Sequence, residues 1–212
     1  MDVEVFSLQT VWDFRLKSNR DKFLSRLEQE CPDEVFFAPP CDPWCAWQRV
    51  NAAKSPEIAK RIQVTRLNHE HTFLKMIKRG FEIQLAGERH AHMEHPDEAE
   101  SWNTTTMLSC PGDFARSDQC QYGLEIYDRD GRYLGMGRKR TRTKTTKDAM
   151  KEIMSERCKC KVNHIHVRGR IAKAAQNYPI IMVNSLVEAI AGEEHLDNIA
   201  PKSDDIYPCT SD

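Results

Sequence analysis

The sequence of 212 residues has no apolar run close to the ~20 residues that are needed to span a bilayer. Its N-terminus also lacks the basic and then apolar pattern of a secretory signal peptide. These two absences predict an intracellular protein, nuclear or cytoplasmic, without a membrane partner. Thiols in that compartment stay reduced, so we expect the eight cysteines to be available for catalysis or metal binding.

An excess of charge of one sign is also missing, because the formal net charge is -1. The whole molecule therefore gains no long-range attraction for nucleic acid, and such binding needs a local patch. The segment 138–147, RKRTRTKTTK, supplies one, with six basic residues in ten. The alternative is a strand pair with a solvated basic face. The predicted nucleic-acid contacts are Arg138, Lys139, Arg140, Arg142 and Lys144.

The stretch 33–47, DEVFFAPPCDPWCAW, predicts a short buried strand at 34–38, which two prolines end just before Cys41. A helix is expected at 19–30, with Asn19 as its cap, and a long helix from Pro56, broken near Thr65. A further strand at 90–94 presents Glu94. This order favours a three-layer α/β fold with a mainly parallel sheet, similar to a truncated Rossmann-like core. Cys41 and Glu94 are then expected at the same edge of that sheet.

The remaining segments predict smaller elements. Strands are expected at 3–6, 10–12 and 118–124, a hairpin around Asp130-Gly131, and helices at 147–158 and 180–190. We predict an α/β core at 1–125, a basic β-rich extension at 126–192 and a loose tail at 193–212.

Three pieces of the sequence resemble the DNA cytosine-5 methyltransferase family. They are Trp12-Asp13, Pro39-Pro40-Cys41 and Met93-Glu94-His95-Pro96, within residues 10–102. The chain is also similar to methyltransferase-like segments of retroelement polyproteins. Their later pieces have counterparts in Asp118-Gln119-Cys120, the threonine-rich basic stretch, Cys158 with His164 and His166, and Tyr178-Pro179.

The resemblance implies a methyl transfer from S-adenosylmethionine to a cytosine base. Cys41 would add to C6 of the base, Glu94 would stabilise N3, and Asp13 would contact the cofactor's adenine. The target base must leave the duplex for this reaction, so a nucleic-acid partner is expected.

Glycine is scarce in the first part of the chain, and the first glycine is Gly80. A cofactor loop uses glycine because its backbone must approach the ligand closely. The shortage therefore keeps open an alternative function, that of a non-catalytic nucleic-acid-binding or assembly module. The oligomeric state is not predicted.

A cluster of cysteine and histidine near the C-terminus predicts a structural zinc site. Its residues are Cys158, Cys160, His164 and His166, within nine positions of the chain. Thiolates and imidazoles are preferred zinc ligands, although this spacing is tighter than that of common zinc fingers. Two alternatives remain open, namely an exposed histidine strand and a cluster that includes Cys110 or Cys120.

Overall fold

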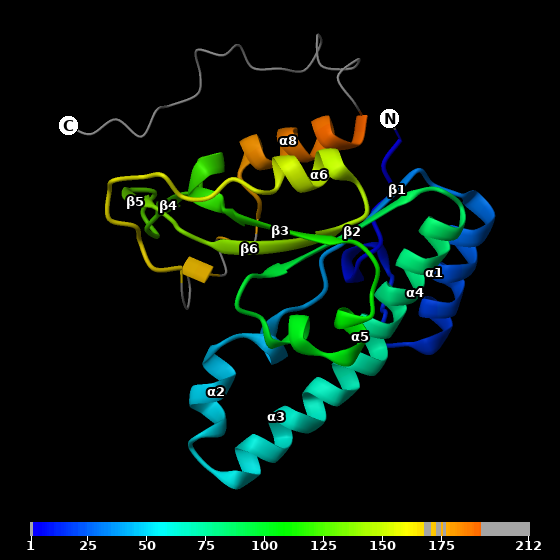
Figure 1. Cartoon of the computed structure of the whole chain (residues 1–212). Helices are drawn as coiled ribbons and strands as arrows, with labels where there is room; N and C mark the ends of the chain where they lie inside the picture. Colours follow the sequence, from blue (N-terminus) through cyan, green and yellow to red (C-terminus); the bar gives the residue numbers. More distant parts are fainter. Residues whose placement is uncertain (1, 168–170, 173–174, 176, 192–212) are drawn as a thin grey trace. The chain divides into compact units, whose positions relative to one another are not determined.

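The computed structural model describes residues 2–167, 171–172, 175 and 177–191, and it divides into two compact units (Figure 1). The first unit comprises Met1–Asp113 with Thr143–Lys147, and the second comprises Phe114–Arg142 with Asp148–Asp212. The chain thus enters the second unit at Phe114, whereas the sequence analysis set the change of domain at residue 126. The predicted tail at 193–212 lies outside the described residues.

The first unit is mainly helical around two parallel strands. Its elements are a 3-10 turn (Leu8–Thr10), α1 (Lys17–Glu30), β1 (Glu34–Phe37), a 3-10 turn (Asp42–Trp44), α2 (Trp47–Ala52), α3 (Pro56–His69), a π-helical turn (Glu70–Leu74), α4 (Lys75–Ala86), β2 (His90–Pro96), a 3-10 turn (Glu100–Asn103) and α5 (Thr105–Leu108). Ser55 caps α3 through a hydrogen bond from the Ile58 amide, and Pro56 occupies the first turn. The predicted long helix is confirmed, but its break lies at the π-helical turn Glu70–Leu74 and not near Thr65.

Two expectations for the N-terminal region are wrong. Residues 3–6 and 10–12 form no strand, because Val3 and Val5 are 72% and 61% exposed and have no apolar layer to face. Leu16, not Asn19, is the cap of α1. The Asn19 amide instead donates to the Asp13 carbonyl at 3.1 Å.

The second unit contains the remaining elements. They are β3 (Asp113–Asp118), a 3-10 turn (Gln119–Tyr122), β4 (Glu125–Tyr127), β5 (Tyr133–Met136), β6 (Arg140–Thr145), α6 (Asp148–Ile153) and α8 (Ile180–Ala191), although the end of β6 and the first residue of β3 belong to the first unit. The predicted hairpin is confirmed by the antiparallel pair β4 and β5, and Gly131 has a φ of 79° in its turn. The strand predicted at 118–124 is wrong, since β3 ends at Asp118. The helix predicted at 147–158 ends early, at Ile153.

The four-stranded sheet has the order β1-β2-β6-β3 and is mixed and mostly antiparallel. The prediction of a mainly parallel sheet is therefore wrong. One part of that prediction is confirmed, because β1 and β2 pair in parallel, with Phe37 opposite Met93. The polar strand β6 lies beside β2, where the sequence analysis predicted no strand. The Rossmann-like three-layer core stays a prediction.

Aromatic and aliphatic side chains fill the core of the first unit. Phe37 of β1 packs against Phe23 of α1 and stacks with Phe81 of α4, at ring-centroid distances of 6.0 and 6.1 Å. Gly80 lets α4 approach this cluster, because a Cβ atom there would lie 2.7 Å from Phe37 Cζ. Figure 1 shows α1 and α4 side by side, consistent with the 3.0 Å ion pair between Glu28 and Arg79.

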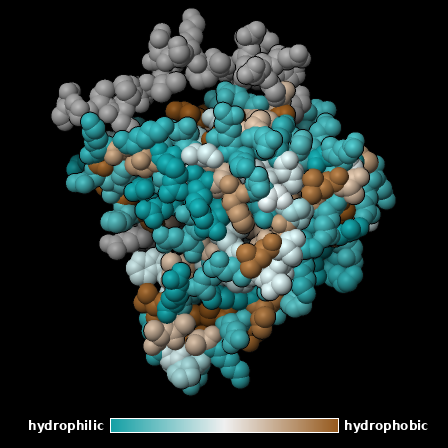
Figure 2. All heavy atoms as spheres, viewed as in Figure 1, coloured by the Kyte–Doolittle hydropathy of each residue, from teal (hydrophilic) through white to brown (hydrophobic). Residues whose placement is uncertain are grey.

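The surface is largely polar. Figure 2 shows a mostly hydrophilic face on which hydrophobic residues form separate patches. Of the helices in the described ranges, none combines the length and the apolar character that crossing a membrane requires.

Candidate metal centre

Three cysteines and one histidine of the second unit converge on one point. Cys120 lies in the 3-10 turn after β3, whereas Cys158, Cys160 and His164 lie in the extended segment after α6. Their four ligand atoms all lie within 4.8 Å of one another, and Cys158 Sγ is 3.6 Å from His164 Nε2. This Cys₃His group can bind a metal ion.

Backbone hydrogen bonds hold the two segments of the site together. The Asp118 amide donates to the Glu156 carbonyl at 2.9 Å, which places Cys120 close to the chain that carries Cys158. Farther along, the Ile165 amide donates to the Met136 carbonyl at 2.8 Å. Because these bonds lie on both sides of the ligands, the extended segment is fixed without regular secondary structure of its own.

Burial shifts the pKa values of one thiol and of the imidazole in opposite directions. Burial and then the neighbouring Cys158 thiol raise the pKa of Cys120 to about 11. Burial, together with the positive charge of Arg138, lowers the pKa of His164, so its imidazole is neutral at pH 7. A neutral imidazole is the form that binds a metal, and a divalent cation would replace the thiol protons.

A glutamine side chain supports the sulfur atoms. Gln121 Nε2 donates to Cys160 Sγ at 3.2 Å and lies 3.9 Å from Cys120 Sγ. Amide donors of this kind stabilise negative charge on thiolates and orient them in metal sites.

A buried carboxylate lies next to the ligands. Asp118 is fully buried; its Oδ2 accepts from the Cys158 amide at 2.9 Å and forms an ion pair with Arg157, whose Nε lies 3.2 Å away. Its Oδ1 accepts from Arg138 Nε at 3.2 Å and lies 3.9 Å from Arg140 Nε. Burial would raise the pKa of Asp118, but these hydrogen bonds and charges outweigh it, and the pKa is lowered.

The structure changes the ligand set that the sequence predicts. Cys158, Cys160 and His164 converge, whereas His166 is exposed and lies outside the group. Cys120, named among the alternatives, takes the fourth position. Its only local signal is that a cysteine stands two residues after Asp118, so its role becomes visible through the fold.

The predicted nucleic-acid contacts mostly touch the protein itself. Lys139 Nζ donates to the Ala175 carbonyl at 3.1 Å, and the Arg142 guanidinium lies 5.5 Å from the centroid of the Phe114 ring. Lys144 is 3% exposed, and burial lowers its pKa. Arg138 and Arg140 face Asp118 Oδ1, with Nε at 3.2 and 3.9 Å, and their side chains are 35% and 44% exposed.

The residues that the methyltransferase resemblance selects lie in the first unit. Cys41 follows β1 and Glu94 lies in β2, and the parallel register places both toward the same end of the pair. Glu94 is 7% exposed. Asp13 binds the guanidinium of Arg15 with both carboxylate oxygens, at 2.9 and 2.8 Å, and these hydrogen bonds lower its pKa.

Two buried imidazoles, to which the sequence analysis assigned no role, lie near the Cys41 loop. His69 Nδ1 accepts from Trp44 Nε1 at 2.9 Å, and His95 Nδ1 lies 2.7 Å from Ser101 Oγ. Burial lowers the pKa of both histidines, to about 4 for His95, and contact with the Pro40 carbonyl opposes the shift. Both rings are therefore neutral at pH 7 and serve to hold the loop.

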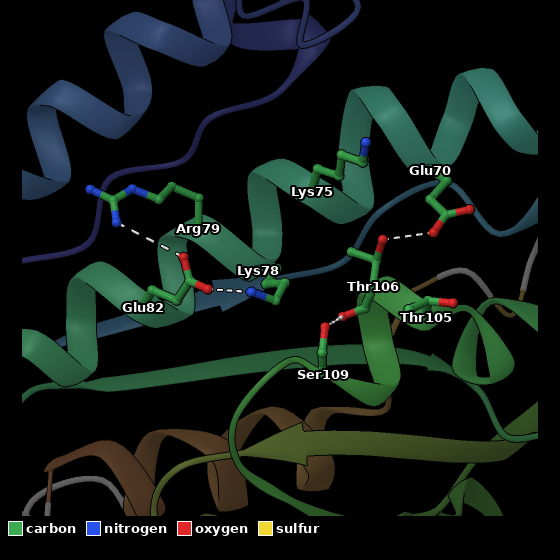
Figure 3. Close-up of a pocket in the computed structure, with 8 residues that line it drawn as sticks. All are labelled: Glu70, Lys75, Lys78, Arg79, Glu82, Thr105, Thr106 and Ser109. Atoms are coloured by element: carbon green, nitrogen blue, oxygen red, sulfur yellow. Dashed lines mark hydrogen bonds and ion pairs between the residues drawn. The ribbon is translucent and has the colours of Figure 1, made fainter.

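The first unit contains a surface pocket of about 520 Å³, and charged side chains that line it form ion pairs with one another (Figure 3). Glu82 pairs with Lys78 and Arg79, and Thr106 donates to Glu70 at 2.6 Å. Its lining is completed by Lys75, Thr105 and Ser109. The basic and acidic groups largely neutralise each other, and the lining contains no cysteine or histidine that could act as a nucleophile or base.

Comparisons with known proteins found no relative of this chain. No protein-family model matches the chain, and neither a curated protein nor a solved structure matches it.

Proposed function

We propose that the second unit is a zinc-ordered nucleic-acid-binding module, in which one structural Zn²⁺ fixes a basic segment of the chain. The convergence of Cys120, Cys158, Cys160 and His164 carries this proposal. Three thiolates and one imidazole form a complete tetrahedral ligand set for zinc. A set without an open position suits a structural ion and leaves no coordination site for a substrate.

The distances suit zinc after a small contraction. Zn–S bonds of about 2.3 Å place tetrahedral ligand atoms about 3.8 Å apart. The four atoms lie within 4.8 Å of one another, so the longest separation has to shorten by about 1 Å, within reach of side-chain rotation. The distance from Cys158 Sγ to His164 Nε2 is already 3.6 Å.

Charge supports nucleic acid as the partner. The second-unit residues 138–142 and 148–161 contain eight basic and three acidic residues, a surplus of five positive charges in a chain whose net charge is -1. The ligands Cys158 and Cys160 alternate with Arg157, Lys159 and Lys161 within this stretch. A metal that fixes the cysteines therefore also fixes the basic side chains between them. Phosphate binding needs only such positioned charges and donors.

Metal analysis of protein purified without chelator tests the zinc site. We expect about one equivalent of zinc in the wild type, and its loss in Cys120→Ser and His164→Ala, because each removes one of four ligands. Cys31→Ser is the matched control, since Cys31 is exposed and outside the group. His166→Ala should retain zinc. Metal-free wild type, or a Cys120→Ser variant that still binds one equivalent, would refute the site.

Fluorescence anisotropy with labelled oligonucleotides tests the partner. The wild type should bind single-stranded and duplex oligonucleotides with an affinity that falls steeply with salt. Protein stripped of zinc and kept reduced should bind the oligonucleotides more weakly, because the metal no longer holds the basic segment in place. Equal binding with and without zinc would contradict the link between the two features.

Cytosine-5 methyl transfer is a second candidate function, favoured by the parallel pairing of β1 and β2. This pairing supports a shared edge for Cys41 and Glu94, the nucleophile and its proposed partner. Calorimetric titration with S-adenosylmethionine tests it. Absence of binding at millimolar cofactor would rule out this activity for the chain, and binding that Asp13→Asn weakens would support it.

A further inference from the structure

Three arginines of the second unit are gathered around one carboxylate. Asp118 is fully buried, and the side chains of Arg138, Arg140 and Arg157 are 35%, 44% and 45% exposed. Arg138 and Arg157 reach the carboxylate through Nε, at 3.2 Å each. A guanidinium held at Nε still has two Nη groups with four N–H donors.

The charges of this cluster do not balance. One carboxylate faces the guanidinium groups of Arg138 and Arg157, which leaves a surplus of one positive charge among these three residues. An anion that approaches from solvent is therefore attracted to the outer ends of these arginines.

We infer that Arg138 and Arg157 form a phosphodiester-binding site for the nucleic-acid backbone, with Arg140 adding positive charge. The inference deepens the proposed function and rests on it. Asp118 acts as a positioning residue that holds both guanidinium groups through Nε. The sequence analysis predicted Arg138 as a nucleic-acid contact but did not predict Arg157.

The chemistry of the guanidinium group suits this ligand. Its planar fork donates two parallel hydrogen bonds to phosphate oxygens, and such charge-assisted bonds are stronger than neutral ones. Anchoring at Nε restricts the long side chains before the ligand arrives, which lowers the entropy cost of binding. Because Asp118 is fully buried, a bound phosphate contacts the arginines and not the carboxylate.

Oligonucleotide binding by Arg157→Gln between 50 and 200 mM salt, measured by anisotropy, tests the site. Loss of one phosphate contact should make the salt dependence shallower by about 0.7 to 0.9 in log–log slope and weaken binding several-fold at low salt. Arg138→Gln should behave alike. Arg132→Gln is the matched control, because Arg132 is exposed in the turn between β4 and β5 and lies outside the cluster around Asp118. It should change the slope less.

One further variant and one further measurement distinguish the possible results. Arg157→Lys keeps the charge but loses the fork, and we expect it to bind more weakly than the wild type. Zinc content confirms that each variant keeps its metal centre. Wild-type binding with the same slope in Arg157→Gln and Arg132→Gln would overturn this inference alone. No wild-type binding to any oligonucleotide, or binding only to anionic phospholipid vesicles, would overturn the proposed function as well.

Discussion

The first unit contains a buried ionic network whose loss should be measurable. Glu34 of β1 accepts from His92 of β2 at 2.6 Å and from Lys147 at 2.5 Å, and His92 Nδ1 lies 2.8 Å from Thr145 Oγ1. His92 is fully buried, and the Glu34 side chain is 12% exposed. The network thus connects β1, β2 and β6 through side chains.

Substitution Glu34→Gln keeps the shape of the side chain and removes its charge. One oxygen can still accept from Lys147, but the hydrogen bond is no longer that of a carboxylate. Since hydrogen bonds to charged groups contribute about 1.5–3 kcal/mol, we expect the free energy of unfolding to fall by roughly 2–3 kcal/mol at pH 7.

The effect should depend on pH in a defined direction. Burial would raise the pKa of Glu34, but the hydrogen bonds from His92 and Lys147 outweigh it and lower the pKa below 4.5. A carboxyl group with a lowered pKa stabilises the fold above its unfolded-state pKa. This contribution is lost as the pH falls through the folded-state pKa. The difference between wild type and variant should therefore be largest at neutral pH and shrink below pH 4.5.

Urea unfolding followed by circular dichroism at pH 7 and at acidic pH measures both effects. Glu28→Gln is the control, because Glu28 pairs with Arg79 at the surface and both side chains are more than half exposed. Surface pairs contribute about 0–1 kcal/mol, so this variant should stay close to the wild type. Equal stability of the two variants would refute the reasoning.

Two further substitutions test the packing. Gly112→Ala should destabilise the protein by about 2 kcal/mol or more, because Gly112 has a φ of 99° and a Cβ atom there would lie 2.6 Å from the Thr145 carbonyl oxygen. Gly131→Ala, at a φ of 79° with nothing within 4 Å, should lower the melting temperature less, and the reverse order would contradict the geometry. Trp44→Phe removes the donor to His69 Nδ1 and should cost about 1–3 kcal/mol in urea unfolding, with an unchanged midpoint as the contrary result.

Local signals predicted the elements that depend on neighbouring residues. Pro56 marks a helix start, and Asp130-Gly131 marks a hairpin, because the preferred backbone angles of these residues determine both. The parallel pair of β1 and β2 followed from an apolar run at 34–38 and an alternating segment at 90–94 on either side of a long helix. These features require no knowledge of distant contacts.

The strand β6 shows what local signals miss. Its sequence, RTRTKT, has the polarity of a surface segment, yet Thr141, Thr143 and Thr145 are buried. The fold supplies partners from far along the chain, since Gln119 donates to Thr141 at 2.9 Å and His92 meets Thr145. Polar residues become suitable for a central strand only when such partners exist.

The same reasoning applies to the candidate site, which the sequence analysis predicted as two separate features. The clustering of cysteine and histidine at 158–166 indicated a metal, and the basic stretch indicated a phosphate partner. Asp118 connects them, because its Oδ2 accepts from the Cys158 amide and its Oδ1 accepts from Arg138. Loss of the metal would release Cys158 and with it the arrangement of the arginines. Coupling between two binding sites is reciprocal, so a nucleic acid that binds the zinc form more tightly must raise the affinity for zinc by the same factor.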